Sequence, residues 1–364
     1  MKYPNRYIML IGLTALLAAG CQSDLLVDYQ EQPQTAVSAI DFVGGFIDNQ
    51  VSTKAVTQLS QHTTSMGVWG WQVPSDVEEE LLLFKNQNVV YSSTLSDWTY
   101  SPKRYWSAGS NYRFYAYAPH SDSVEGASVS IDPESGRFSI DGITLKGSNL
   151  MSIEASRTTK GMFGSVTDVD WMIDRNGLSG MRGNFGNRVT FNMQHILAKL
   201  NVKVRVNNVL DSDNNTTVIL DSVTVSSLAG GGSFEQKLNH TPNPESESDN
   251  AVQEWTIDTD VPAHGLVSTK SVDVDGTGYY VIESLVIPQT IGEECKVKAS
   301  FTMTSADGRM ERFVSVFGLS EAFDSFATGY NYTLTITMAP DVITFDAGSG
   351  SWDDHNVVAG GTIY

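Results

Sequence analysis

A cysteine near the start of the chain has the sequence context for a covalent modification. Cys21 closes the segment Ala18-Ala19-Gly20-Cys21, and an apolar run over residues 8–19 precedes it, with two basic residues further upstream. A run of this length is too short to span a bilayer and matches the core of a secretory signal peptide. Small residues before a cysteine suit a lipoprotein signal peptidase, which leaves an N-terminal cysteine carrying acyl chains such as palmitate. The sequence predicts a signal peptide over 1–20 and lipidation of Cys21; an ordinary secretory signal is the alternative.

The second of the two cysteines, Cys295, has no disulfide partner if Cys21 is lipidated. It opens a stretch in which every second residue is apolar or small, which places these residues on one face of a strand: Cys295, Val297, Ala299, Phe301 and Met303. The predicted role of Cys295 is that of a small buried hydrophobe rather than a nucleophile.

Motifs for catalysis or metal binding are absent from the sequence. It contains no His-Glu-x-x-His, no Gly-x-Ser-x-Gly and no phosphate-binding glycine loop. The segment Asp211-Ser-Asp213-Asn-Asn215 begins like a calcium loop, but Thr216 replaces the turn glycine and Ser222 the bidentate glutamate. We therefore expect no metal, no cofactor and no enzymatic activity; an acidic surface hydrolase is an alternative without a motif to support it.

Six aromatic residues crowd the first half of the chain: Trp69, Trp71, Trp98, Tyr100, Tyr105 and Trp106. Trp69 and Trp71 are two residues apart and so lie on one face of a strand. Two interpretations stay open for this pair: stacking against the sugar rings of a glycan, or packing in the core or at a domain interface.

The charge balance excludes some partners. The chain has 42 acidic and 23 basic residues, a net charge of -19. Such a charge argues against binding nucleic acid or anionic lipid and favours solubility at a cell surface. No second apolar run approaches the length of a transmembrane helix.

Alternation of apolar and polar residues dominates the remaining pattern and predicts strands. The clearest strands span residues 330–338 and 200–206, and weaker ones lie around 112–118, 223–225, 279–286 and 314–317. Helical patterns are few, at Asp76–Phe84 and Leu319–Phe326. Many short strands separated by Gly, Ser, Asn and Asp turns predict an all-β protein built of antiparallel sandwiches.

Two tandem sandwich domains fit the length of the chain. A glycine-rich stretch, Gly177–Gly186, suggests the boundary, which gives domains at 55–187 and 188–364. Residues 240–250 are rich in Pro, Ser, Asn and Glu and are expected to form a long exposed loop.

Taken in order, several motifs resemble the fimbrillin family, the subunits of type V pili. In the first domain they are Ile40-x-Phe42, Thr53-Lys54-Ala55, Met66-Gly67-Val68-Trp69-Gly70-Trp71, Phe84-x-Asn86-Gln87-x-Val89-x-Tyr91, Trp98-x-Tyr100-x-Pro102-x-x-Tyr105-Trp106 and Tyr112-x-Phe114-x-Ala116-Tyr117-Ala118-Pro119. In the second they are His195-x-Leu197-Ala198-Lys199-Leu200, Ile287-Pro288-Gln289 and Gly329-Tyr330-x-Tyr332-x-Leu334-x-Ile336. The resemblance covers nearly the whole mature chain and implies transthyretin-like sandwiches.

The resemblance also implies a processing step. Members of the family are lipidated, carried to the outer membrane and cut by a trypsin-like protease, which releases the first strand. Lys54 is the only Lys or Arg between Cys21 and Lys85. A cut between Lys54 and Ala55 would remove residues 21–54, a propeptide holding the strand of Ile40 and Phe42. A surface lysine on a loop is the alternative for Lys54.

In this family the vacated groove is filled by a strand of another subunit, and the C-terminus offers two candidates. Ile343, Phe345 and Ala347 alternate with polar residues, and an apolar tail with Val357, Val358 and Ile363 follows. A donated strand would restore backbone pairing and cover apolar surface. An ordinary terminal strand of its own domain is the alternative.

Two functional hypotheses follow. The first is a structural pilus subunit, an outer-membrane lipoprotein precursor that becomes part of a surface fimbrium, polymerises with like or unlike subunits and contributes to adhesion. The second is a monomeric outer-surface lipoprotein that binds glycans through Trp69 and Trp71. The position in a pilus (stalk, tip or anchor) stays open.

Overall fold

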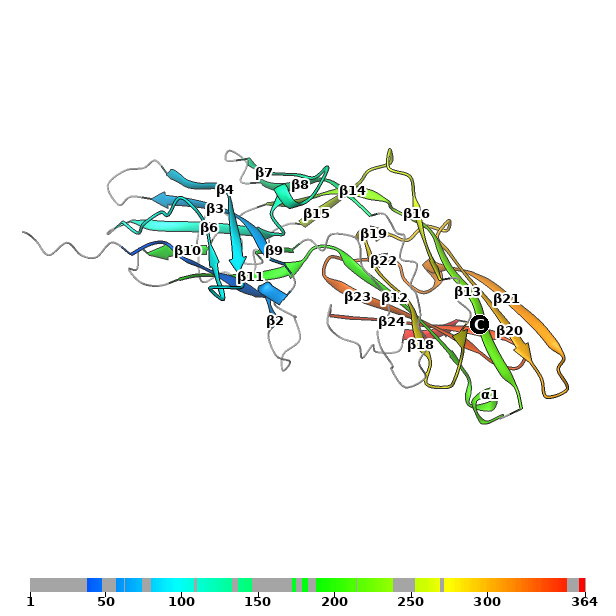
Figure 1. The fold of residues 1–364 in the computed structure, drawn as a ribbon. Helices are drawn as coiled ribbons and strands as arrows, with labels where there is room; N and C mark the ends of the chain where they lie inside the picture. Colours follow the sequence, from blue (N-terminus) through cyan, green and yellow to red (C-terminus); the bar gives the residue numbers. More distant parts are fainter. Residues whose placement is uncertain are drawn as a thin grey trace, which may run out of the picture. The chain divides into compact units, whose positions relative to one another are not determined.

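The computed structural model describes thirteen stretches of the chain (Figure 1): 38–47, 57–61, 63–73, 80–107, 110–132, 137–145, 172–174, 179–182, 188–213, 215–237, 253–268, 272–351 and 360–363. Almost every element is a strand, which confirms the predicted all-β class. In the part of the chain so described, no helix has the length and apolar character needed to cross a membrane.

The first sheet is built from the N-terminal half of the chain. Its order is β2-β1-β11-β9-β6-β3-β4-β5, with β10 also pairing β6. The strands are β1 (Phe42–Ile47), β2 (Thr57–Gln58), β3 (Ser65–Val73), β4 (Leu81–Ser92), β5 (Asp97–Thr99), β6 (Asn111–Ala118), β9 (Met172–Asp174), β10 (Ser179–Arg182) and β11 (Val189–His195). Figure 1 shows β3, β4 and β6 side by side. All pairs are antiparallel except β1 with β11, which run parallel.

A second sheet joins segments from both halves of the chain, in the order β15-β14-β8-β7. Its strands are β7 (Ser128–Asp132), β8 (Arg137–Thr144), β14 (Gly231–Lys237) and β15 (Gln253–Ile257). Phe138 and Ile140 of β8 share an apolar cluster with Phe234 of β14 and with Leu285. In this sheet β8, which precedes residue 187, pairs with β14, which follows it. The strands of this sheet therefore do not separate at residue 187, and the domain boundary near that residue stays a prediction.

Two further sheets form a sandwich from the C-terminal half. One has the order β18-β12-β23-β24-β25 and the other β16-β13-β20-β21, with β17 also pairing β13. The strands are β12 (Ala198–Val206), β13 (Thr217–Leu228), β16 (His264–Ser268), β17 (Val272–Asp273), β18 (Tyr279–Val286), β20 (Lys296–Thr304), β21 (Met310–Gly318), β23 (Tyr330–Met338), β24 (Ile343–Ser351) and β25 (Gly360–Ile363). A short ribbon pairs β19 (Gln289–Thr290) with β22 (Ser325–Phe326). The stacked rings of Phe317 and Phe345, 3.7 Å apart, join the two sheets within their shared core.

Strict alternation in the sequence predicts these strands well. The strand expected at 330–338 is β23 with the same bounds, and the one expected at 200–206 lies within β12. On β12, Leu200, Val202 and Val204 are fully buried, as the pattern requires. The weaker strands predicted around 112–118, 223–225, 279–286 and 314–317 correspond to β6, β13, β18 and β21.

The predicted helices are less successful. Of the helix expected at Asp76–Phe84, the structure describes residues 80–84; Leu81–Phe84 belongs to strand β4, so that prediction is wrong there. Pairing with β3 outweighs the local pattern, because it buries Phe84 in the core and leaves Leu81 and Leu82 half exposed. The helix expected at Leu319–Phe326 is reduced to a 3-10 turn, Leu319–Glu321, followed by β22.

One short α-helix, α1 (Asn208–Ser212), was not predicted. Asn207 caps it, since its side chain accepts a hydrogen bond from the Leu210 N–H. The calcium-like segment begins inside this helix, with Asp211 and Ser212, and Asp213 then accepts bonds from the Asn215 N–H and the Thr216 hydroxyl. Among the residues that the structure describes, no group of three or more His, Cys, Asp or Glu could hold a metal.

The predicted burial of Cys295 is confirmed. It is 1% exposed, and its Sγ donates to the Ser227 carbonyl over 3.1 Å. Burial raises the pKa of this thiol. A neutral, enclosed thiol of this kind is a poor nucleophile.

We expect Cys295 to react with an uncharged thiol reagent at pH 8 at least about tenfold more slowly in the folded protein than in denaturant. Because the unfolded thiol ionises first as the pH rises, the free energy of unfolding should fall above about pH 8.5. Peptide mapping of the labelled site separates Cys295 from Cys21. Equal labelling rates in the two states would contradict the burial.

Candidate functional site: the first strand and its groove

Strand β1 is held on both of its backbone edges. It runs parallel to β11, with Phe42 opposite Val189, and antiparallel to β2, with Ile47 opposite Thr57. Just upstream, Ala39 forms an isolated antiparallel bridge with Tyr105. The strand is therefore an interior member of the sheet rather than an edge.

Two apolar side chains lie in the core here, one on the first residue of β1, Phe42, and one two residues before it, on Ile40. Ile40 and Phe42 are both 0% exposed. Four rings surround Phe42, with centroid distances of 5.3 Å to Phe84, 5.4 Å to Tyr100, 5.8 Å to Phe114 and 5.9 Å to Phe191. Contacts at these distances add to the large apolar area that each ring buries. Phe42 is thus the centre of the first core, not its margin.

Buried hydrogen bonds fix the backbone on either side of Ile40. The Tyr100 hydroxyl donates to the Ile40 carbonyl over 2.6 Å, and burial raises the pKa of Tyr100. The Ile40 N–H donates to the Arg104 carbonyl over 2.8 Å, and the Trp106 N–H donates to the Ser38 carbonyl over 3.1 Å. Each of these bonds would lose a partner if the first strand left.

Charged side chains close the outside of the groove. Lys103 forms an ion pair with Asp41 at 2.7 Å, and both side chains are more than a third exposed. Arg188 donates to the Phe42 carbonyl over 2.9 Å and also pairs with Asp97. Exposed pairs of this kind contribute little to stability, so the apolar contacts of Phe42 dominate the retention of β1.

The connection after β1 contains the predicted cleavage site. β1 ends at Ile47 and β2 begins at Thr57; Lys54 and Ala55 lie between them, outside the described residues, as does Cys21. A cut after Lys54 would separate β1 covalently from the rest of the sheet. It would leave β1 held by hydrogen bonds and apolar contacts alone.

The two C-terminal candidates differ in how firmly they are held. Ile343, Phe345 and Ala347 of β24 are buried in the core of the second sandwich. β24 pairs with β23 along its whole length and also with β25. β25 pairs with β24 alone and ends the sheet order, with Ile363 opposite Phe345; Val357 and Val358 lie outside the described residues.

The tryptophan pair is part of the protein interior. Trp69 is 5% exposed, and its ring lies 5.4 Å from Tyr117 and 6.1 Å from Phe138. Trp71 is partly buried and packs against the same cluster. Trp69 therefore presents no exposed ring face to a sugar, and core packing explains the pair better than glycan stacking.

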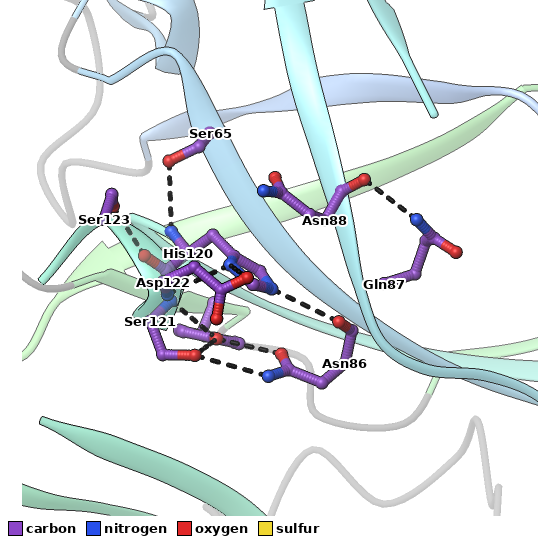
Figure 2. A network of polar contacts seen from close by, with 9 residues as sticks. Ser65, Asn86, Gln87, Asn88, His120, Ser121, Asp122 and Ser123 are labelled. Atoms are coloured by element: carbon purple, nitrogen blue, oxygen red, sulfur yellow. Dashed lines mark hydrogen bonds and ion pairs between the residues drawn. The ribbon is translucent and has the colours of Figure 1, made fainter. Parts of the chain in front are cut away.

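Sequence reasoning missed a polar network that ties β3, β4 and β6 together (Figure 2). His120 is 2% exposed; its Nδ1 accepts from the Asp122 N–H at 3.1 Å, and its Nε2 lies 3.2 Å from the Asn86 carbonyl. The His120 N–H donates to Ser65 Oγ, and the Tyr117 hydroxyl donates to Asn86 Oδ1. Asn86 has a φ of 47°, a backbone conformation that asparagine tolerates better than most residues. A histidine right after Tyr117-Ala118-Pro119 was the only signal for this network.

Comparison with known proteins gives a consistent result. The sequence profile of the fimbrillin-like family matches residues 53–351. The structure of a fimbrial protein from Bacteroides vulgatus superimposes with a TM-score of 0.57 at 14% identity, covering 86% of this chain and 99% of that one. No curated protein matches the chain significantly.

Two other solved structures are less similar. One, described as a cell adhesion protein from Bacteroides ovatus, has a TM-score of 0.49 at 15% identity and covers 88% of this chain and 100% of that one. The tip fimbrial protein Mfa3 from Porphyromonas gingivalis has a TM-score of 0.31 at 9% identity, with 87% and 98% covered. At these scores neither supports an argument about this chain.

Replacing Phe42 by alanine should lower the free energy of unfolding by about 3–5 kcal/mol, since it empties the centre of the ring cluster. Asp41→Asn, on the same strand but in an exposed ion pair, should change it by about 1 kcal/mol or less. Denaturant unfolding followed by tryptophan fluorescence measures both. Equal effects of the two variants would contradict the central position of Phe42.

Proposed function

The chain belongs to the fimbrillin-like family, and from this premise we propose that it is a structural subunit of a type V-like pilus assembled by strand exchange. In this proposal the precursor is lipidated on Cys21, carried to the outer membrane and cut after Lys54 by a trypsin-like protease. The cut removes β1, another subunit's strand fills the groove, and the resulting surface fimbrium contributes to adhesion. The observation that supports this most is the interior position of β1, with the buried Ile40 and Phe42.

Loss of β1 would leave a site that strongly favours an incoming strand. The sockets of Ile40 and Phe42 would be empty, at a cost of roughly 2–5 kcal/mol for each lost side chain. The facing backbone groups of β2 and β11 would be unpaired, and buried groups without partners are costly. A strand that carries apolar residues on one face would repair both losses at once.

Lys54 suits the cut because of where it lies in the chain. It follows the last residue of β1, Ile47, and precedes the first residue of β2, Thr57. As the only basic residue between Cys21 and Lys85, it gives a trypsin-like protease one choice in that segment. Cleavage there detaches the lipid anchor and β1 together.

The donor in this proposal is the end of the chain, with β25 rather than β24 as the part that leaves. Ile343-x-Phe345 repeats the apolar spacing of Ile40-x-Phe42, but both side chains already fill their own core. Extracting β24 would break its pairing with β23 and unstack Phe345 from Phe317. Among the backbone pairings that the structure describes, freeing β25 breaks the short one with β24. Releasing the tail from Val357 to Ile363 thus breaks fewer of the described backbone pairings than releasing β24, and we take this tail as the donor.

Partners follow from the same arrangement. The groove accepts a strand from another pilin subunit, of the same or a different kind, since the requirement is apolar spacing and a free backbone edge. The net charge of -19 keeps unassembled subunits soluble and gives no reason to expect nucleic acid as a partner.

Lys54→Gln should leave the protein lipidated and at the surface but abolish pilus assembly, because the protease has no basic residue to recognise before β2. N-terminal sequencing of protein sheared from the native cell should give Ala55 for the wild type. Lys85→Gln, at the next basic residue along the chain, is the matched control and should assemble normally.

Normal pili from the Lys54→Gln strain would contradict the processing step. A wild-type protein whose N-terminus is an acylated Cys21 would instead indicate an anchor subunit that keeps its first strand.

Deleting residues 357–364 should give a folded, processed monomer that accepts a donor strand but cannot supply one, so that chains longer than a dimer with a competent subunit do not form. Size-exclusion chromatography with light scattering distinguishes the species. Unimpaired polymerisation by the deletion variant would place the donor elsewhere. The double variant Ile343→Ser/Phe345→Ser should instead unfold the second sandwich, because these residues belong to its core.

A further inference from the structure

A set of polar side chains lies buried on the outer face of the sheet that contains β12. Leu200, Val202 and Val204 of β12 point into the sandwich core, so Lys199 and Asn201 lie on the opposite face. That face is expected to be wet. Yet Asn201 is 3% exposed, and the Lys199 side chain is 14% exposed.

The neighbouring strands add two more buried polar groups at the same level. Asn331 of β23 is opposite Lys199 in the parallel register and is 0% exposed. Glu283 of β18 is opposite Asn201 and is 7% exposed. The Lys199 Nζ contacts Glu283 Oε1, and Asn201 Nδ2 donates to Asn331 Oδ1 over 2.5 Å. An amine, a carboxylate and two carboxamides therefore share one patch on three adjacent strands.

The surroundings of this patch are apolar at one end. Leu285, which is opposite Lys199 on β18, belongs to the cluster that includes Trp69 and Phe138. Further along β12, Arg205 has a side chain 44% exposed in its pair with Asp346. On β12, the polar side chains of Lys199 and Asn201 are thus more buried than that of Arg205.

Stability does not explain a lysine and a glutamate in such a place. The desolvation cost of two charges offsets most of their attraction, so a buried ion pair adds little that apolar side chains would not. A carboxylate in contact with a buried lysine can, in contrast, act as the general base that turns the amine into a nucleophile. Fixing it next to an acyl group raises the effective concentration by many orders of magnitude.

We propose that Lys199 and Asn331 form an intramolecular isopeptide bond, with Glu283 as the catalytic acid and base. Adjacent strands are about 4.8 Å apart, within the reach of a lysine side chain. The bond would join the first strand of the C-terminal sandwich, β12, to β23. This inference is independent of the proposed function, because it concerns covalent chemistry within one subunit.

The step balances without a co-reactant. Glu283 accepts a proton from the Lys199 ammonium, and the free Nζ attacks Cγ of Asn331 to give a tetrahedral intermediate. The bond from Cγ to Nδ2 breaks as Glu283 protonates the departing nitrogen, which leaves as ammonia. Glu283 then takes the proton that the new amide nitrogen loses and passes it to ammonia, which becomes ammonium.

The test is the mass of the purified full-length protein and of its tryptic peptides. The expected result is a mass about 17 Da below that of the sequence, the mass of the lost ammonia. Trypsin should no longer cut after Lys199, and a branched peptide should join residues 189–203 to residues 313–364, which contain no internal Lys or Arg other than Lys199 and the terminal Lys203.

Three variants separate the cross-link from other losses of ammonia. Lys199→Arg and Asn331→Ala should restore the full mass and the separate peptides, and Glu283→Gln should abolish or strongly slow the reaction. Lys203→Arg makes the same replacement four residues further along β12 and should keep the mass loss.

A wild-type protein of full mass that trypsin cuts after Lys199 would overturn the proposal, whatever the variants do. A 189–203 peptide closed on itself would also overturn it, because the acyl group would then come from a carboxamide within that peptide, such as Asn201, and not from Asn331. A mass loss that persists in Lys199→Arg would show that ammonia leaves from another site.

Discussion

The burial of Phe42 among four aromatic rings is the interaction on which the first sheet depends. Without it the core formed by Phe84, Tyr100, Phe114 and Phe191 has no centre. The backbone bonds around Ile40 and the parallel pairing with β11 add direction and register, but the apolar contacts supply most of the free energy. A strand near the start of the chain therefore completes a core whose other residues come mainly from far downstream.

Strands that are decided by local alternation could be predicted from the sequence. Strands that are decided by pairing between distant residues could not. β23 and β12 alternate strictly, so their extent and the burial of most of their apolar residues followed from the sequence, although Tyr330 at the start of β23 is 42% exposed. β4 did not, because its apolar start is decided by pairing with β3 and not by local pattern. The pairing of β14 with β8 joins segments roughly ninety residues apart, and nothing local marks it.

At the candidate site, too, some features could be predicted from the sequence and others, which depend on residues distant in sequence, could not. The resemblance to the fimbrillins placed Ile40 and Phe42 in the first strand; both are buried, and β1 itself begins at Phe42. Tyr100 and Arg188, which hold the backbone of that strand, could not be assigned this role, because their hydrogen bonds span long separations in sequence. The buried state of Asn201 and Asn331 was likewise invisible, since alternation predicts a wet face there.

The two strands that flank β1 run in opposite directions, and this has a consequence for any strand that takes its place. Because β1 runs parallel to β11 and antiparallel to β2, the slot it occupies has a sense: a strand entering in reverse would meet a different hydrogen-bond pattern on each side. Any chain of molecules linked through this slot repeats one orientation head to tail. Its two ends are chemically distinct, one with an open slot and one with an unused strand, so such a fibre has polarity and can be extended in a defined direction.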